Sequence, residues 1–354
     1  MVTTDAVLSV LTTAQARAAG VSRLLRDGTY ARVARGLWLV AGADPEDPDT
    51  RIRLATAGVP GDVVVGGWAA ARLHEATRLR RGRPGQVDGR SGVPLRPEPV
   101  LVLVPPETRL VDRPFRRLLR TRVPDRDRAE VAGVAVTAPD RTAVDVARLS
   151  PLPLAVPVLD RLRALGLVSA ASVAAALDRC GPLAGLHRAR RALAFSVDGA
   201  ESPQESAMRL LWCEAGLPVP EPNVEILDGS GRFVVRVDVL DAEAGLVGEY
   251  DGAVHASARS RSADATRQQR LEQLGLVVVR ATSVDLATPA ARAAWCVRLR
   301  EAHRRARAHP IKATWRRRRP RARLPGPPAA GTRMDPNAPT HLGVSVRSDP
   351  FRDR

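Results

Sequence analysis

The stretch from Arg236 to His255, RVDVLDAEAGLVGEYDGAVH, most constrains what this chain can fold into. The run from Arg232 to Leu240 alternates between valine and other residues, and Leu246 to Asp251 forms a second short run rich in apolar residues. Between them, the residues DAEAG supply a turn. This pattern predicts a β-hairpin with a half-buried face.

Three acidic side chains fall on one face of the predicted hairpin. With the turn centred in DAEAG, Asp238 lies opposite Glu249, and the strand period of two puts Asp251 on the same face as Glu249. Two carboxylates about 4 Å apart repel by roughly 4 kcal/mol at an effective dielectric near 20, so such a patch requires a cation, an arginine or a proton. A divalent metal is one candidate, and Arg236, on the same face as Asp238, is the other.

Helices and strands flank the hairpin in a specific order. The residues SPQE (202–205) form a capping box that predicts the start of a helix. A strand is predicted over 223–227, and a helix over 264–274 follows the hairpin. The run VVVRAT (277–282) is typical of a buried strand. The predicted order is helix, three strands, helix, strand.

This order resembles the restriction-endonuclease-like (PD-(D/E)xK) nuclease superfamily, and within it a domain of unknown function related to very short patch repair endonucleases. The resemblance covers about residues 199–290 and rests on ESPQES, RVDV, GEYDGAVH, RQQRLEQLG and VVVRAT. It implies that Asp238 and Glu249 hold Mg²⁺, with Glu205 as an optional third ligand, and that the metal activates water for attack on a phosphodiester.

Asp251 departs from the superfamily pattern, which usually has a lysine there to stabilise negative charge. The resemblance leaves Asp251 as a further metal ligand, with His255, Arg267 or Arg270 supplying the acid or the positive charge. In a simpler interpretation, His255 is a loop histidine and the two arginines form a solvated helix face. The implied catalytic set is Asp238, Glu249, Asp251 and His255.

Two of the acidic residues have structural explanations to weigh against a metal. The capping box accounts for Glu205, since such a cap contributes about 1 kcal/mol of helix stability, and we rank this role above a ligand role. Asp238 is harder to explain, because a strand interior disfavours aspartate unless a partner binds it. Arg236 and Arg280 are candidate partners.

Residues 4–40 have the pattern of a winged helix-turn-helix. Apolar residues from Val7 to Leu11 predict a first helix, AQARAAG after Thr13 a second, and Val21 to Asp27 a third. The run TYARVARGLWLV predicts a two-stranded wing. In that fold the third helix enters the major groove and the wing contacts the DNA backbone. Candidate groove residues are Ser22, Arg23 and Arg26, and candidate phosphate contacts are Arg32 and Arg35. The alternative is a helical subdomain with solvated arginines.

This segment resembles the N-terminal winged-helix domain of the AbiEi family of type IV antitoxins, through TTAQARAAGVSRLLRDGTYARVARGLWLV. The resemblance continues more weakly through GGWAAARLHEA, VLVLVP and GVAVTAPDRTAVDVAR, and so covers roughly the first 150 residues. The last motif predicts the end of a strand followed by a helix. We interpret its Asp140, Arg141 and Asp145 as cap and surface charges.

The net charge of +17 is unevenly distributed along the chain. Residues 298–354 hold sixteen Arg or Lys against four Asp or Glu, a balance of +12, which leaves +5 for the rest. This tail has no apolar period, so we predict disorder from about residue 308. Three separated cysteines suggest neither a zinc site nor a disulfide framework. The absence of a signal-like or membrane-length apolar run predicts a cytoplasmic protein that does not use a membrane.

We therefore expect an α+β multi-domain protein: a winged helix-turn-helix (1–50), an α/β middle region (51–150), a helical bridge (151–198), a restriction-endonuclease-like α/β domain (199–307) and a disordered basic tail (308–354). The expected function is binding of double-stranded DNA, with Mg²⁺-dependent endonuclease activity in the C-terminal domain. The alternative is a non-enzymatic autorepressor of a type IV toxin-antitoxin system, with a cognate toxin as partner.

Overall fold

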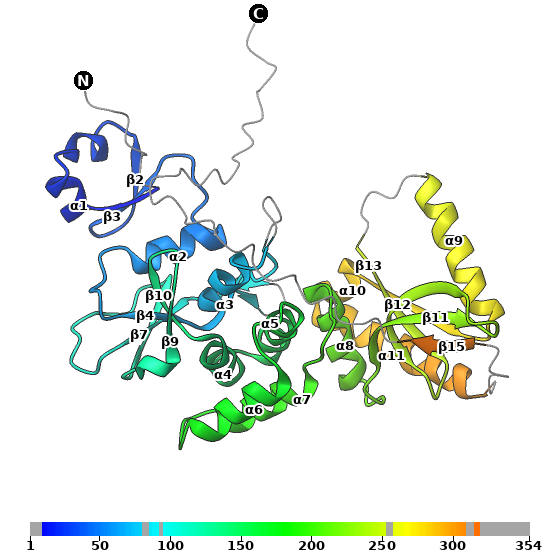
Figure 1. The fold of residues 1–354 in the computed structure, drawn as a ribbon. Coiled ribbons are helices and arrows are strands. Elements are labelled where there is room, and N and C mark those ends of the chain that lie inside the picture. Colours follow the sequence, from blue (N-terminus) through cyan, green and yellow to red (C-terminus); the bar gives the residue numbers. More distant parts are fainter. Residues whose placement is uncertain (1–8, 80–84, 92–94, 253–257, 309–314, 319–354) are drawn as a thin grey trace, which may run out of the picture.

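The computed structural model describes residues 9–79, 85–91, 95–252, 258–308 and 315–318, without the side chains of 258–265. It is a mixed α+β multi-domain structure, as the sequence predicts. Figure 1 shows an N-terminal unit (blue) and a C-terminal unit (yellow to orange) at opposite ends of the molecule, with a helical region (green) between them. In the described part of the chain, no helix is both long enough and apolar enough to cross a bilayer.

The N-terminal unit is a small three-stranded sheet with two short helices. Its elements are β1 (Val10–Thr12), α1 (Thr13–Ala18), η1 (Ser22–Leu25), β2 (Tyr30–Ala34) and β3 (Leu37–Val40). The strands lie in the order β1-β3-β2, and β2 and β3 form the predicted two-stranded wing. Leu11, Ala16, Leu25 and Tyr30 form its core.

Two predictions for this unit are wrong. Val10 and Leu11 lie in strand β1, which pairs with β3, because Thr12 caps α1 and a cap residue has an extended backbone. The third helix is a single 3₁₀ turn, η1, and does not continue to Asp27. The Asp27 carboxylate accepts hydrogen bonds from the Thr29 N–H and hydroxyl, at 3.1 and 2.7 Å, and this local turn competes with further helix.

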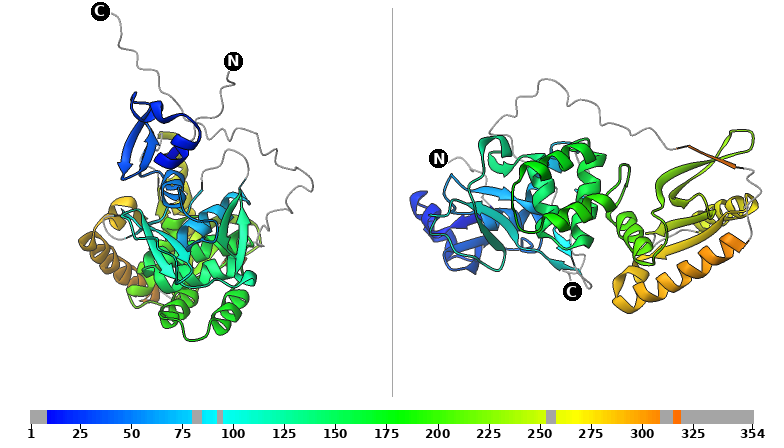
Figure 2. Two further views of the ribbon diagram at one scale, coloured as in Figure 1. Left: turned by 90° about the vertical axis from the view of Figure 1, so that its left-hand side faces the viewer. Right: turned by 90° about the horizontal axis from the view of Figure 1, so that it is seen from below.

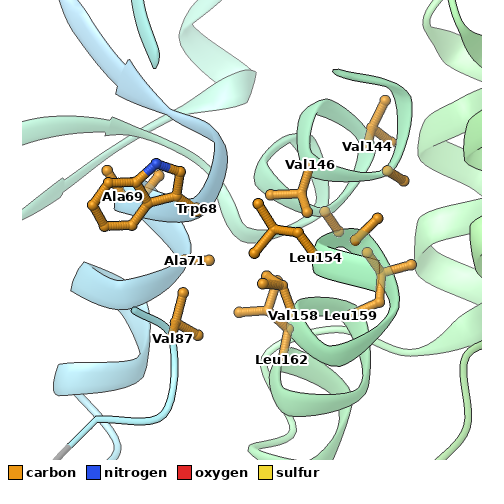
Figure 3. Packing of buried hydrophobic residues seen from close by; sticks show 14 of the residues in the cluster. Trp68, Ala69, Ala71, Val87, Val144, Val146, Leu154, Val158, Leu159 and Leu162 are labelled. Atoms are coloured by element: carbon orange, nitrogen blue, oxygen red, sulfur yellow. The ribbon is translucent and has the colours of Figure 1, made fainter. Parts of the chain in front are cut away.

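The middle region packs a five-stranded sheet against helices that include those of the predicted bridge. The elements are α2 (Pro48–Thr56), β4 (Val64–Gly66), α3 (Gly67–Ala76), β5 (Arg90–Ser91), β6 (Arg96–Pro97), β7 (Val100–Val104), β8 (Arg116–Arg120), η2 (Asp125–Asp127), β9 (Arg128–Val131), β10 (Val134–Thr137), α4 (Pro139–Leu149), α5 (Leu152–Ala164), α6 (Ala170–Arg179) and α7 (Leu186–Phe195). The sheet has the order β8-β7-β4-β10-β9. Figure 3 shows Trp68 of α3, Val144 of α4 and Leu159 of α5 in one apolar core.

Helix α4 contains buried charges where we predicted surface charges. Asp145 is fully buried and pairs with Arg141 at 2.9 Å and with Arg148 at 2.8 Å. The helical spacing i,i+3 and i,i+4 brings the three side chains together. The spacing itself does not reveal burial, because the same pattern is common on solvated helix faces.

The C-terminal unit contains the predicted order of helix, three strands, helix, strand. Its elements are α8 (Pro203–Glu214), β11 (Glu221–Asp228), β12 (Phe233–Asp241), β13 (Leu246–Asp251), α9 (Ala258–Gln273), β14 (Val277–Thr282), α10 (Ser283–Ala287), α11 (Pro289–Ala308) and β15 (Trp315–Arg318). The sheet has the order β14-β13-β12-β11-β15, in which β13 and β14 are parallel and the other neighbours antiparallel. Helices α8 and α11 share one apolar cluster with the sheet, and α9 contributes to another. Figure 2 shows the ribbon of the long helix α11 (orange) beside the sheet.

The prediction of disorder is wrong for part of the basic tail. Strand β15 adds an antiparallel edge beside β11. Arg317 pairs with Glu221 at 3.2 Å, and Arg318 pairs with Glu225 at 2.6 Å. Cross-strand ion pairs of this kind explain how an arginine-rich segment joins a sheet. Residues 309–314 and 319–354 of the predicted tail lie outside the described residues.

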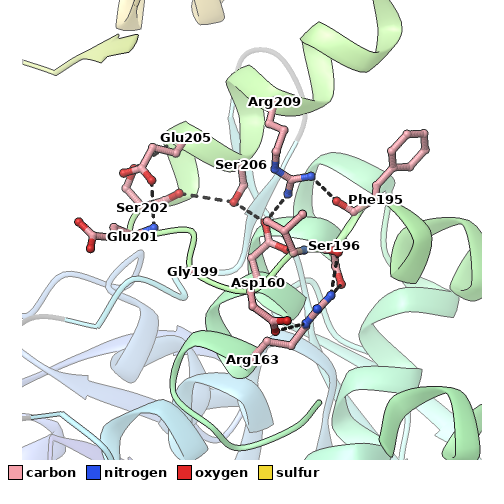
Figure 4. A network of polar contacts seen from close by, with 12 residues as sticks. Asp160, Arg163, Phe195, Ser196, Gly199, Glu201, Ser202, Glu205, Ser206 and Arg209 are labelled. Atoms are coloured by element: carbon pink, nitrogen blue, oxygen red, sulfur yellow. Dashed lines mark hydrogen bonds and ion pairs between the residues drawn. The ribbon is translucent and has the colours of Figure 1, made fainter. Parts of the chain in front are cut away.

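A buried ion pair joins the helical region to the C-terminal unit. Asp160 of α5 and Arg209 of α8 lie 2.5 Å apart, with side chains only 1% exposed. Asp160 also accepts hydrogen bonds from the Ser206 hydroxyl and the Val197 N–H, both at 2.7 Å, and Arg209 donates to the Phe195 carbonyl. Figure 4 shows this network, which we call the domain joint. Its charged groups are hydrogen-bonded and paired, as buried charges require.

Candidate functional site

The strands β12 and β13 pair over a short distance and then diverge. Their ladder runs from Asp241↔Leu246 to Val239↔Gly248, and the next residue on each strand is Asp238 and Glu249 respectively. We call this pair of acidic residues the strand fork. The Asp238 carboxylate accepts the Tyr250 N–H at 2.7 Å, so a side chain binds a backbone donor just beyond the last rung. The predicted hairpin is thus present, and the two acids that we predicted to lie opposite each other directly follow its last rung.

The fork belongs to a polar row that crosses four strands. Pro222 pairs with Val239 and Val224 with Val237, so Asn223 of β11 stands opposite Asp238. On the other side, Glu249 pairs directly with Arg280 of β14. Adjacent strands lie about 4.8 Å apart, so neighbouring side chains in such a row interact. The row therefore contains an amide, two acids and a guanidinium in that order.

Burial and the charge of Glu249 both disfavour the ionised form of Asp238 at the fork. Burial raises the pKa of Asp238 above its ordinary value of 3.8, and the charge of Glu249 raises this pKa further. The Tyr250 N–H and Arg267 act in the opposite direction without reversing the shift. A half-buried carboxylate with a raised pKa beside a second carboxylate is a site that favours a cation.

Two arginines supply the counter-charge of Glu249. Arg267 of α9 lies 2.7 Å from one carboxylate oxygen, and Arg280 lies 3.8 Å from the other. The interpretation of Arg267 as part of a solvated helix face is therefore wrong. The prediction of Arg236 as the counter-charge is also wrong, because its guanidinium pairs with Glu201 at 2.5 Å. The Arg236 backbone carbonyl, in contrast, accepts a hydrogen bond from Arg267.

Glu205 acts as a helix cap in this structure. Its carboxylate accepts hydrogen bonds from the Glu201 N–H and the Asn223 amide at 3.0 Å, and from the Ser202 hydroxyl at 2.9 Å. Burial raises the pKa of Glu205, and the charge of Asp238 adds to that shift. The Ser202 side chain caps the helix by accepting the Glu205 N–H, as predicted, but the Glu205 carboxylate binds the N–H of Glu201 and not that of Ser202, so only half of the predicted capping box is present. The three-ligand metal set is not found among the described residues.

A divalent metal fits the fork with two protein ligands. Among the described residues, no three acidic, histidine or cysteine side chains converge closely enough to hold a metal. Asp238 and Glu249 nevertheless both follow the last rung of the ladder, close enough for the charge of Glu249 to act on Asp238. Mg²⁺ commonly takes one or two carboxylates together with waters and substrate phosphates. Arg267 already pairs with one Glu249 oxygen and therefore competes with a metal for that oxygen.

The remaining predicted site residues are less informative. Asp251 is exposed at the end of β13, where it pairs with Thr282 of β14. His255 lies outside the described residues. In the N-terminal unit Ser22 is half-buried at the start of η1. The four candidate DNA-binding arginines of this unit are all exposed, namely Arg23, Arg26, Arg32 and Arg35.

The N-terminal unit is positively charged. From residue 9 to residue 43 it holds five arginines against Asp27, a balance of +4. No ion pair to Arg26, Arg32 or Arg35 is found among the residues that the structure describes. Such uncompensated arginines are suited to phosphate groups. The short η1 turn supplies fewer groove-facing positions than the helix that we predicted.

Sequence reasoning named Arg267 as a source of positive charge without its partner, and it missed Asn223. The position of Arg267 within a helix gave no sign of its partner, because α9 approaches the fork only in the folded chain. Asn223 follows Pro222 with a left-handed backbone (φ 49°), a conformation that asparagine tolerates better than most residues. The sequence signal that could have drawn attention to Asn223 was an asparagine at the start of a predicted strand.

Comparisons with known proteins give two similar chains from Mycobacterium tuberculosis. They are named "Uncharacterized protein MT2308" (strain CDC 1551 / Oshkosh) and "Uncharacterized protein Rv2248" (strain ATCC 25618 / H37Rv). Each is 30% identical over 257 residues, which span 72% of this chain and 86% of the relative. No family model matches the chain.

Proposed function

The chain belongs to the same family as these two mycobacterial proteins, and we propose that it is a DNA-binding protein whose C-terminal unit is a metal-dependent nuclease. The observation that carries this proposal is the strand fork, where Asp238 and Glu249 directly follow the last rung of the β12–β13 ladder. The strand order β14-β13-β12-β11, with β13 and β14 parallel, supports it, because it agrees with the restriction-endonuclease-like resemblance.

The N-terminal arginines support binding to double-stranded DNA. Arg23 and Arg26 on and beside η1, and Arg32 and Arg35 on the wing, are exposed in a unit with a charge balance of +4. Because η1 is only four residues long, we propose phosphate contacts as its main contribution. This part of the chain carries the resemblance to the AbiEi antitoxins.

In the proposed reaction, Asp238 and Glu249 would hold Mg²⁺. When bound, the metal supplies an activated water and neutralises negative charge on the phosphate. Arg267, released from Glu249, and Arg280 remain beside the fork and provide positive charge for a phosphodiester. Asp251 stands where the superfamily usually has a lysine, so these arginines are our candidates for the electrostatic role of that lysine.

Nicking of supercoiled plasmid DNA in Mg²⁺ or Mn²⁺ tests this function. We expect wild-type protein to nick, and Asp238→Ala and Glu249→Ala each to lose at least about a hundredfold in rate, the scale for removing an electrostatic catalytic group. Glu243→Ala is the matched control, because Glu243 is an exposed acid in the turn of the same hairpin. Equal nicking by all four proteins would point to a contaminating nuclease and refute the assignment.

A second candidate is a non-enzymatic, antitoxin-like autorepressor with a cognate toxin as partner. The observation in its favour is that Arg267 and Arg280 already neutralise Glu249, so the fork has a counter-charge without a metal. This candidate predicts no nicking by any variant and specific binding to DNA upstream of the protein's own coding sequence. A promoter-reporter assay with wild type and Arg32→Ala distinguishes it from the nuclease.

A further inference from the structure

A groove lies beside the strand fork, along residues 233–236 of β12. It has a volume of about 520 Å³ and is lined by residues 233–236 of β12 and by Thr266, Arg267 and Arg270 of α9. It exists because β13 pairs with β12 only at residues 239–241, so this side of residues 233–237 has no β13 partner among the described residues. Arg236 and Arg267 belong both to the groove and to the surroundings of the fork.

An exposed aromatic ring lies at the start of the groove. Phe233 is 58% exposed, and it is the one aromatic residue among the exposed large hydrophobic side chains that the structure describes. Val234 and Val235 continue the apolar strip toward Arg236. An exposed phenylalanine beside a groove is typical of a surface that binds a flat apolar group.

The rest of the groove is cationic. Three arginines contribute to its lining and no acidic side chain does so among the described residues. Arg236 and Arg267 have carboxylate partners, Glu201 and Glu249, whereas Arg270 has no ion pair within the described part of the chain. An aromatic surface next to guanidinium groups is the combination that binds unpaired nucleotides, through stacking on the base and contacts to the phosphate.

The size of the groove restricts which form of DNA it can accept. A volume of about 520 Å³ lies within the range of roughly 300–1,000 Å³ that is typical of sites for one small ligand. It therefore has room for nucleotides of one strand. Because Arg267 lines this groove and also pairs with Glu249, a strand that occupies the groove lies beside the fork.

We propose that this groove binds an unpaired segment of a DNA strand, with a base stacked on Phe233 and phosphates on Arg236, Arg267 and Arg270. The inference rests on the proposed nuclease function and specifies its substrate class. The preferred DNA contains a junction between duplex and single strand. The N-terminal unit holds the duplex part, and the groove directs the unpaired strand to the fork.

Fluorescence anisotropy with the full-length protein, without divalent metal, tests this proposal. Two labelled probes share one duplex, and one of them adds a single-stranded overhang of about ten nucleotides, within the range that single-strand sites cover. Wild type should bind the overhang probe more tightly than the blunt probe. Phe233→Ala should weaken overhang binding by roughly 5- to 150-fold, the equivalent of one lost stacking contact, and leave blunt binding unchanged.

Two variants control this result. Phe233→Trp keeps an aromatic surface and should retain the preference for the overhang. Val219→Ala truncates another side chain that is 58% exposed, and should behave as wild type. The inference would be overturned if wild type bound both probes with equal affinity. It would also be overturned if Phe233→Ala lost the same affinity for both probes. Neither result would contradict the proposed binding of duplex DNA. A wild type that binds neither probe would overturn the proposed function as well.

Discussion

The domain joint and the strand fork each contain an arginine paired with a carboxylate, but the two arginines differ in how far they are exposed to water. At the joint, Asp160 and Arg209 are each 1% exposed and hydrogen-bonded to their neighbours. At the fork, Glu249 is 10% exposed, but Arg267 is 38% exposed and reaches the carboxylate from a separate helix. Removing one partner of a pair closed off from water leaves an uncompensated buried charge. A pair with an exposed arginine allows the counter-charge to be exchanged, for a metal or for a phosphate.

The largest effect is expected at the joint. Arg209→Ala leaves the buried Asp160 carboxylate without its ion-pair partner, which should lower the free energy of unfolding by about 3–5 kcal/mol. Urea denaturation followed by circular dichroism measures it. The control is Arg190→Ala, which removes a pair to Asp178 that is 3.6 Å long and mostly exposed, and should change stability by less than about 0.5 kcal/mol. Similar losses in both variants would contradict the difference between buried and exposed pairs.

Removal of Arg267 should lower the stability less than removal of Arg209, and Mg²⁺ should offset this loss. Arg267→Ala should cost about 1 kcal/mol, because the pair is partly solvated and Arg280 remains beside Glu249. It also removes the group that competes with a cation at the fork. Millimolar Mg²⁺ should therefore raise the melting temperature of Arg267→Ala by more than that of wild type. In Arg209→Ala, where the fork is intact, the increase should equal that of wild type.

The smallest expected effect is a change in how the stability of Asp238→Asn depends on pH. The pKa of Asp238 is raised by burial, so the folded protein holds this proton more tightly than the unfolded chain. Its stabilising contribution is present below the ordinary value of 3.8 and is lost as the pH rises through the folded pKa. Asp238→Asn lacks this titration, and its stability relative to wild type should increase from acid to neutral pH.

Asp228 provides the control of opposite sign. Hydrogen bonds from Ser230 and Arg232 lower the pKa of this turn residue. Its contribution is present above the ordinary value of 3.8 and is lost as the pH falls through the folded pKa. Relative to wild type, Asp228→Asn should therefore be less stable at neutral than at acid pH. Urea unfolding from acid to neutral pH measures both trends. If the stability of both variants relative to wild type changed in the same direction with pH, the raised pKa of Asp238 at the fork would be contradicted.

The sequence predicted those parts of the fold that depend on local patterns. Valine alternation and a turn specify the β12–β13 hairpin, and the SPQE capping box marks the start of α8. Predictions failed where contacts between residues far apart in the sequence determine the secondary structure. Val10 and Leu11 were assigned to a helix, but pairing with β3 makes them a strand. The arginines of β15 resemble a disordered tail, but acidic residues on β11 bind them.

The sequence predicted the acidic residues of the candidate site, but not the side chains that surround them. The register of a hairpin follows from its sequence, so Asp238 and Glu249 could be placed opposite each other. The arginine partners of Glu249 come from other elements. Arg267 reaches Glu249 from α9, and Asn223 of β11 donates to Glu205 of α8. Only the packing of the C-terminal unit brings these groups together.

Calorimetric titration of Mg²⁺ or Mn²⁺ into wild type, Asp238→Ala and Arg267→Ala tests the central claim most directly, because it requires no substrate. If the fork is a metal site, wild type binds the ion, Asp238→Ala does not, and Arg267→Ala binds more tightly than wild type. Glu243→Ala should match wild type, since Glu243 is exposed in the hairpin turn. An absence of binding in both wild type and Arg267→Ala would contradict the claim and favour the autorepressor.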